Sequence, residues 1–159
     1  MFYYKAVYGM NSVCLRYANV YGPRQNPEGE AGVVAIFTGR MLRKEEPLVN
    51  GDGKQTRDYV FVGDVVRANV LALGHVGSGV FNVGTGIETD VNHLFGKLKT
   101  LTGFTGPERH APGKRGEQLR SVLSYDRARK VLGWEPTVDI TEGLKRTVEF
   151  FRKTRHNAP

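Results

Sequence analysis

The chain has 159 residues, a length that predicts one domain, and its 40% hydrophobic and 25% charged content is typical of a globular protein. The single cysteine, Cys14, excludes an internal disulfide and favours the reducing cytoplasm, and the sequence has neither a leader-like start nor an apolar run of ~18 residues, which argues against secretion and membrane spanning. The net charge of +7 fits either a polyanion partner such as nucleic acid or solvated helix faces with a few cations aimed at a phosphate; basic residues alternate with acidic and apolar ones, so we favour the second interpretation.

The hydrophobic pattern predicts alternating strands and helices. Residues 1–9 are typical of the end of an aromatic-rich helix that stops near Gly9. Strands are predicted at 13–17, 47–50, 59–62 and 80–83. The first strand is almost continuously apolar, which predicts that it is buried in a parallel sheet.

Helical spacing of apolar residues predicts five further helices. They are expected at 33–43, from a cap at Asp64 to Leu73, at 90–102 with Thr89 as cap, from a cap at Ser124 to Gly133, and from a cap at Asp139 or Thr141 onward. Residues 107–120 are rich in glycine, proline and charge and predict a loop.

Several catalytic motifs are missing from the sequence. The histidines at positions 75, 93, 110 and 156 lack metal-ligand spacing, so we expect no metal site. No G-x-S-x-G elbow supports a Ser-His-Asp hydrolase. The two candidates for a G-x-G-x-x-G dinucleotide loop carry Thr56 and Thr89 in place of the third glycine, and no lysine follows a tyrosine by four positions.

Two polar residues lie where a loop can offer a side chain to a phosphate. Arg57 stands between the glycine-rich turn at 51–53 and the next strand, where it could bind a diphosphate bidentately or pair with Asp52 or Asp58. Asn19 follows the first strand, where its amide could bind a phosphate oxygen or cap a turn. The residue pattern alone leaves both alternatives open.

Three motifs carry a resemblance to a known family: LRYANVYGPRQ at 15–25, GDGKQTRDY at 51–59 and LGWEP at 132–136. They are similar to the sugar-nucleotide half of an extended short-chain dehydrogenase/reductase, most like the UDP-glucose (UDP-galactose) 4-epimerases. The resemblance covers essentially the whole chain. It implies one partial domain, residues 1–159, that forms the C-terminal, substrate-binding part of a Rossmann-type α/β fold, with the N-terminal nucleotide-binding half absent.

The resemblance implies an NAD-dependent enzyme that oxidises the sugar at C4, lets the ketosugar turn over and reduces it on the other face. That chemistry needs the glycine-rich loop and a Tyr-x-x-x-Lys pair, so we expect no catalytic residue here, no epimerase activity of the isolated chain and little or no bound NAD. A UDP-sugar is the expected partner, and nucleic acid and membranes are not. The partners that would bury the first strand are expected to come largely from the absent half, so its exposed apolar edge also predicts a homodimer or other self-association.

The resemblance also assigns site residues by position. Tyr17 falls at the nicotinamide end of NAD. Asn19 and Arg57 fall on diphosphate-binding positions with Tyr59 beside them, which favours the phosphate interpretation of both. The remaining positions are the uridine pocket (Val33, Leu48, Asn50 and Val91), a second diphosphate-binding cation (Lys114), a ribose-binding acid (Glu117) and a residue that limits room at sugar carbon 2 (Ser121).

Three of these positions bear on specificity. Asn50 stands where an aromatic residue commonly packs on the base, and Lys114 stands where arginine is common. Ser121 is small, which predicts that UDP-N-acetylglucosamine fits as well as UDP-glucose. Two other classes of function remain open: another enzyme of the extended family, such as an NDP-sugar 4,6-dehydratase or a UDP-glucuronate decarboxylase, and a non-catalytic nucleotide-binding or scaffolding module.

Overall fold

The computed structural model describes residues 2–28 and 32–156. Strands and helices alternate as predicted, and Gly9 follows the first helix with a φ of 65°. None of the helices within the described ranges is long and apolar enough to cross a membrane. In chain order the elements are α1 (Phe2–Tyr8), β1 (Val13–Tyr17), β2 (Asn19–Tyr21), α2 (Val33–Leu42), β3 (Leu48–Asn50), β4 (Thr56–Phe61), α3 (Val62–Leu73), β5 (Gly79–Val83), β6 (Glu88–Asp90), α4 (Val91–Thr102), β7 (Arg109–Ala111), β8 (Arg120–Ser121), α5 (Asp126–Leu132) and α6 (Ile140–His156).

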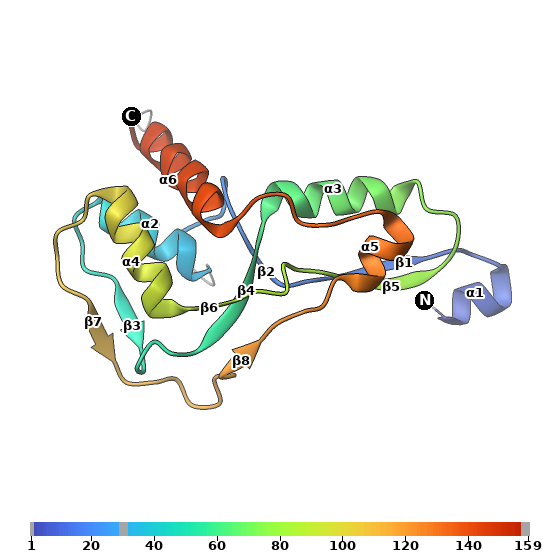
Figure 1. Cartoon of the computed structure of the whole chain (residues 1–159), viewed down its shortest axis with the longest axis horizontal. Coiled ribbons are helices and arrows are strands. Elements are labelled where there is room, and N and C mark those ends of the chain that lie inside the picture. Colours follow the sequence, from blue (N-terminus) through green and yellow to red (C-terminus); the bar gives the residue numbers. More distant parts are fainter. Residues whose placement is uncertain (1, 29–31, 157–159) are drawn as a thin grey trace.

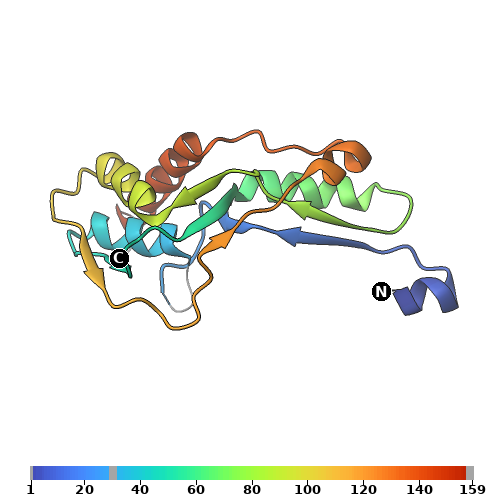
Figure 2. The same cartoon turned by 60° about the horizontal axis from the view of Figure 1, so that its bottom comes forward.

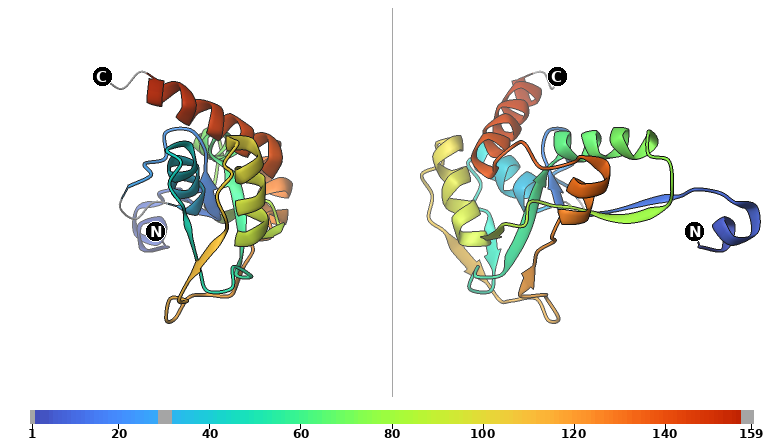
Figure 3. Two further views of the ribbon diagram at one scale, coloured as in Figure 1. Left: turned by 90° about the vertical axis from the view of Figure 1, so that its left-hand side faces the viewer. Right: turned by 45° about the vertical axis from the view of Figure 1, so that its right-hand side comes forward.

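The strands form three small sheets. β1 pairs in parallel with β5, and β3 pairs in parallel with β7. β4 is the centre of the third sheet, where it pairs in parallel with β2 and β8 and antiparallel with β6. Figure 1 shows α3 and α5 at the end that holds β1 and β5, and α2, α4 and α6 at the opposite end. The right-hand view of Figure 3 also shows α3 and α5 apart from α2 and α4.

α1 and β1 form one edge of the molecule. Figure 2 shows α1 beyond the end of β1, away from the other helices. Among the described residues, β1 pairs with β5 alone, so its second edge is open. The predicted parallel strand is confirmed, and within the described residues it is only partly covered. Leu15 is only partly buried and Tyr17 is exposed, because β1 has one neighbouring strand and one covering helix, α3.

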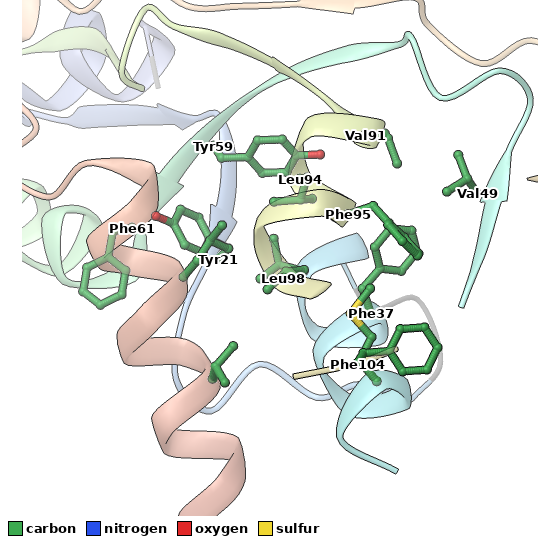
Figure 4. Packing of buried hydrophobic residues seen from close by; sticks show 14 residues of the cluster. Tyr21, Phe37, Val49, Tyr59, Phe61, Val91, Leu94, Phe95, Leu98 and Phe104 are labelled. Carbon is green, nitrogen blue, oxygen red and sulfur yellow. The ribbon is translucent and has the colours of Figure 1, made fainter. Parts of the chain in front are cut away.

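Two hydrophobic clusters hold the elements together. The larger one packs α2, α4 and α6 against β2 and β4 (Figure 4). Its aromatic rings meet edge to face, as between Phe37 and Phe95, whose ring centres lie 5.8 Å apart. The second cluster gathers Phe81, Trp134 and apolar residues of α3, α5, β1 and β5.

Asp64 is not the helix cap that the pattern predicted. α3 already begins at Val62, and Asp64 lies buried in its first turn. Its carboxylate accepts hydrogen bonds from the Thr137 amide at 3.1 Å, the Thr137 hydroxyl at 2.7 Å and the Val138 amide at 3.1 Å. Its carbonyl oxygen accepts one from Trp134 Nε1 at 2.9 Å. These contacts tie α3 to the segment before α6, so tertiary partners took the place of the local cap.

Aspartate residues cap the N-termini of α4 and α6. Asp90, and not Thr89, caps α4: its carboxylate accepts a hydrogen bond from the His93 amide at 2.7 Å. Thr89 instead lies within β6, in register with Arg57 of β4. Of the two candidates for α6, Asp139 is confirmed, because its carboxylate accepts a hydrogen bond from the Thr141 amide at 2.8 Å.

The segment predicted as a loop at 107–120 contains β7 and the start of β8. β4 also begins at Thr56, earlier than the predicted strand. β7 and β8 are short and pair with strands that are distant in the sequence, so the local residue pattern gives little indication of them. At α5 the N-cap residue is Tyr125 instead of Ser124, although the Ser124 hydroxyl still accepts a hydrogen bond from the Asp126 amide at 3.3 Å.

Glu88 joins three strands on one face. From β6, its carboxylate accepts hydrogen bonds from Arg120 on β8, through Nε at 2.9 Å and Nη2 at 2.6 Å, and from the Thr56 hydroxyl on β4 at 2.6 Å. The hydrogen bonds from Arg120 and then from Thr56 lower the pKa of Glu88 from 4.5 to about 2. This contact holds β8, and with it the end of the preceding loop, against β4.

We expect the stability supplied by this contact to depend on acid pH. A carboxyl group with a lower pKa in the folded chain stabilises it fully above pH 4.5 and loses that contribution as the pH falls towards about 2. Glu88→Gln therefore lowers the melting temperature at neutral pH, and its difference from wild type shrinks in acid. Thermal unfolding followed by circular dichroism measures this. Glu142→Gln controls for the loss of an exposed carboxylate. If the difference in melting temperature between Glu88→Gln and wild type stayed constant from neutral to acid pH, the prediction would be contradicted.

Candidate functional site

A cavity of about 510 Å³ lies between α2, β3, β4 and the loop before β8, a size typical of ligand pockets. Every residue predicted to bind substrate lines it except Ser121, although these residues are scattered along the sequence. The predicted residues in its wall are Asn19, Val33, Leu48, Asn50, Arg57, Tyr59, Val91, Lys114 and Glu117, and the unpredicted ones are Gly32, Ile36, Phe37, Arg40 and Gln55.

β4 supplies two of the polar groups. Side chains alternate along a strand, so Arg57 and Tyr59 share the face that borders the cavity, whereas Asp58 between them points to the other face. Asn19 on β2 stands in register with Tyr59, which brings its amide to the same wall. The start of β2 and the middle of β4 thus form one polar surface.

Asp58 holds β4 in place from the opposite side. Its side chain is buried, and its carboxylate accepts hydrogen bonds from the Thr85 amide at 2.8 Å, the Thr85 hydroxyl at 2.6 Å, the Gly86 amide at 3.1 Å and the Leu123 amide at 3.3 Å. Four donors satisfy a charge that would be costly to bury alone. Asp58 therefore fixes both the turn after β5 and the segment after β8.

Arg57 is a partly buried cation of the cavity wall. Its Nη1 donates to the Thr56 carbonyl oxygen at 2.8 Å, and its Nη2 lies 3.7 Å from Glu117 Oε1. The alternative in which Arg57 pairs with Asp52 or Asp58 is wrong, because its ion-pair partner comes from the loop before β8. At 3.7 Å this pair is loose, so the guanidinium keeps donors for a ligand.

The cavity carries more positive than negative charge, with Arg40, Arg57 and Lys114 against Glu117. The Glu117 amide donates to the Lys114 carbonyl oxygen at 3.2 Å, so one tight turn presents both side chains. Burial raises the pKa of Tyr59 to about 12, which keeps its hydroxyl protonated at neutral pH. This set of donors suits an anionic ligand.

The turn at 51–53 shapes the adjoining wall. Gly53 has a φ of +73°, and a Cβ there would lie 1.6 Å from Asn92 Oδ1, so no other residue fits without a shift. Its carbonyl oxygen accepts a hydrogen bond from the Val91 amide at 3.0 Å, and Asn92 Nδ2 donates to the Asp52 carbonyl oxygen at 2.9 Å. The turn is thereby joined to the start of α4, which places Val91 in the cavity wall.

Four side chains of the wall were not predicted: Ile36, Phe37, Arg40 and Gln55. Helical spacing from Val33 was the available signal for the first three, because they follow it on one face of α2. Gln55 gave no sequence signal. Its Nε2 donates to the Asn50 carbonyl oxygen at 3.0 Å, which ties the end of β3 to the start of β4.

Two predicted positions lie outside the cavity wall. Ser121 on β8 stands in register with Arg57, so it adjoins the site without lining it. Tyr17 lies in a separate groove beside α3, where it is 44% exposed and its hydroxyl donates to Asn69 Oδ1 at 2.9 Å. Their roles stay predictions. Within residues 2–28 and 32–156, no group of three or more His, Cys, Asp or Glu side chains is placed to hold a metal ion.

Comparison with known proteins identifies the family. The NAD dependent epimerase/dehydratase family matches residues 1–84, more than half of the chain. The chain belongs to this family. A UDP-glucose 4-epimerase of Mycolicibacterium smegmatis is 48% identical over 150 residues, which cover 94% of this chain and 48% of that protein.

Solved structures agree. A UDP-glucose 4-epimerase of Thermotoga maritima, solved with UDP-glucose, is 55% identical with a TM-score of 0.93 and covers 96% of this chain and 50% of its own. The Thermus thermophilus enzyme, solved with NAD, is 41% identical with a TM-score of 0.85 and covers 94% and 49%. The predicted resemblance and fold class are confirmed, and the chain spans about half the length of the relatives it matches.

Proposed function

We propose that this chain forms the UDP-sugar-binding part of an NAD-dependent UDP-glucose 4-epimerase. The observation that carries the proposal is the convergence of Asn19, Arg57, Tyr59, Lys114 and Glu117 on one cavity. The related Thermotoga maritima enzyme, 55% identical, was solved with UDP-glucose. A dTDP-glucose 4,6-dehydratase of Actinoplanes is 34% identical, so the dehydratase alternative has weaker support.

The proposed contacts follow from the chemistry of each side chain. Arg57 binds the diphosphate with its remaining guanidinium donors, and Lys114 adds a second positive charge. Asn19 and the protonated Tyr59 donate hydrogen bonds to phosphate oxygens. The Glu117 carboxylate accepts hydrogen bonds from the ribose hydroxyls.

The base occupies the apolar part of the cavity in this proposal. Val33, Leu48 and Val91 supply apolar contact, with the Asn50 side chain in place of the aromatic residue common in relatives. Arg57 and Lys114 neutralise the diphosphate at the other part of the site. An epimerase gains from such an arrangement, because the nucleotide stays anchored while the sugar turns over.

In the complete enzyme, bound NAD supplies hydride transfer at the sugar. The described residues do not form an NAD site by themselves: the Tyr17 hydroxyl is bonded to Asn69, and the sequence lacks both the glycine-rich loop and the Tyr-x-x-x-Lys pair. We therefore assign anchoring of the nucleotide to this chain and no proton or hydride step. We also propose a role in carbohydrate metabolism in the cytoplasm, which the lone Cys14 favours.

Arg57→Ala is the direct test of the proposal. Loss of a charge-assisted contact weakens UDP binding by about 2–4 kcal/mol, whereas Arg57→Lys is a partial rescue because it keeps the charge and loses the fork. Isothermal titration of the chain with UDP measures both, with Arg43→Ala as a control because Arg43 pairs with Glu45 outside this cavity. We expect no interconversion of UDP-glucose and UDP-galactose by the chain alone. An unchanged UDP affinity in Arg57→Ala would contradict the proposal and would give Arg57 a structural role through its ion pair with Glu117.

Ser121→Tyr tests the proposed gate for the sugar. Ser121 lies on β8 in register with Arg57 of β4. If Arg57 binds the diphosphate as proposed, a tyrosine ring at position 121 would crowd a group on sugar carbon 2. We expect the variant to lose UDP-N-acetylglucosamine binding at least about tenfold and to keep UDP-glucose binding. Titration with both sugars measures this, and Ser121→Ala serves as the control of similar size. Equal losses for both sugars would remove Ser121 as the gate.

The open edge of β1 and the exposed side chains of α1 support self-association, as a homodimer or a larger species. Tyr3, Tyr4 and Tyr8 touch one another but are each more than half exposed, and Val7 between them is 53% exposed. Light scattering is expected to show species larger than a monomer, and Val7→Lys is expected to shift them toward monomer. Val76→Lys, at a loop position 91% exposed, is the control. A wild-type monomer that unfolds cooperatively at high temperature would contradict this.

A further inference from the structure

One stripe of α2 lines the cavity from end to end. Val33, Ile36, Phe37 and Arg40 recur at the spacing of a single helix face, and all four belong to the cavity wall. Val33 and Arg40 are seven residues apart, or about 10 Å along the helix axis. The stripe therefore begins with three apolar residues and ends with a cation.

Among the arginines of the cavity wall, Arg40 is the one whose guanidinium has no partner within the described residues. In the part of the chain that the structure describes, its side chain forms no ion pair or hydrogen bond, whereas Arg57 contacts Thr56 and Glu117, and Arg43, one turn further on, pairs with Glu45. Arg40 is partly buried in the wall. A partly buried guanidinium with five unused donors is well placed to bind an acceptor that enters the cavity.

The surroundings of Arg40 separate it from the diphosphate-binding cluster. Helical side chains lean toward the helix N-terminus over the residues three and four positions earlier, which for Arg40 are Phe37 and Ile36. Figure 4 shows Phe37 packed beside Phe95, below Val91 and away from Tyr59. Arg40 thus borders the apolar wall, where the proposed function puts the base.

We propose that Arg40 binds the keto edge of the nucleobase and makes the cavity select uracil over cytosine. This rests on the proposed function. Arginine has donors and no acceptor. Uracil, like thymine, presents the O4 acceptor at the position where cytosine presents the N4 amino donor. The guanidinium can donate to the first and meets donor against donor with the second, so UDP and dTDP are accepted and CDP is rejected at this edge.

The test compares UDP with CDP, which share the ribose and the diphosphate. Isothermal titration measures both affinities for the wild-type chain, Arg40→Ala, Arg40→Gln and the control Arg43→Ala. Loss of the charge-assisted contact weakens UDP binding about tenfold in Arg40→Ala, with a much smaller change for CDP. A glutamine amide carries both a donor and an acceptor, so Arg40→Gln narrows the preference for UDP by improving CDP binding. Arg43→Ala leaves both affinities unchanged.

Different outcomes separate this inference from the function it rests on. Equal losses of UDP and CDP in Arg40→Ala would make Arg40 a phosphate contact and overturn base selection, as would an unchanged ratio of the two affinities. Arg57→Ala weakens both nucleotides alike if the proposed function holds, because the diphosphate is common to them. A wild-type chain that binds neither nucleotide would overturn the proposed function, and the inference with it.

Discussion

The buried carboxylate of Asp58 is the constraint on which the cavity depends. Because side chains alternate along β4, Arg57 and Tyr59 can face a ligand only while Asp58 faces the interior. A charge buried there is stable only with its donors in place, and these come from the turn after β5 and the segment after β8. One residue that lines no part of the cavity therefore fixes the strand that supplies two of its polar groups.

The second half of the polar wall comes from a loop with little structure of its own. Lys114 and Glu117 lie in one turn, and the loop is fastened only where β7 pairs with β3 and where Arg120 meets Glu88. The Arg57–Glu117 pair connects this loop to β4. Ligand affinity thus depends on a rigid strand on one side and on an ion-paired loop on the other.

Sequence periodicity predicted α2 and α4 to within one residue, because each buries a continuous apolar stripe. It misassigned Asp64, whose carboxylate binds Thr137 and Val138, 73 and 74 residues away, as well as the nearby Arg67. It also missed β7 and β8, which pair with distant strands. Of the substrate-binding residues that the family resemblance named, all except Ser121 lie in the cavity wall. Neither the periodicity nor the family resemblance predicted Arg40 as a site residue. The periodicity shows that Arg40 follows an apolar stripe on α2, and only the fold shows that this stripe borders a cavity.

The positive charges on the exposed surface and those in the cavity wall have different physical effects. Exposed pairs such as Arg43–Glu45 and Arg146–Glu142 are screened by solvent and contribute little to stability. Arg40 and Arg57 in the cavity wall are partly withdrawn from water, where the same charges attract an anion more strongly, whereas Lys114 is exposed. With three cations and one acid, the cavity has an excess of positive charge, which favours an anionic ligand. In the proposed function this charge anchors the nucleotide, and the sugar is left free to turn over.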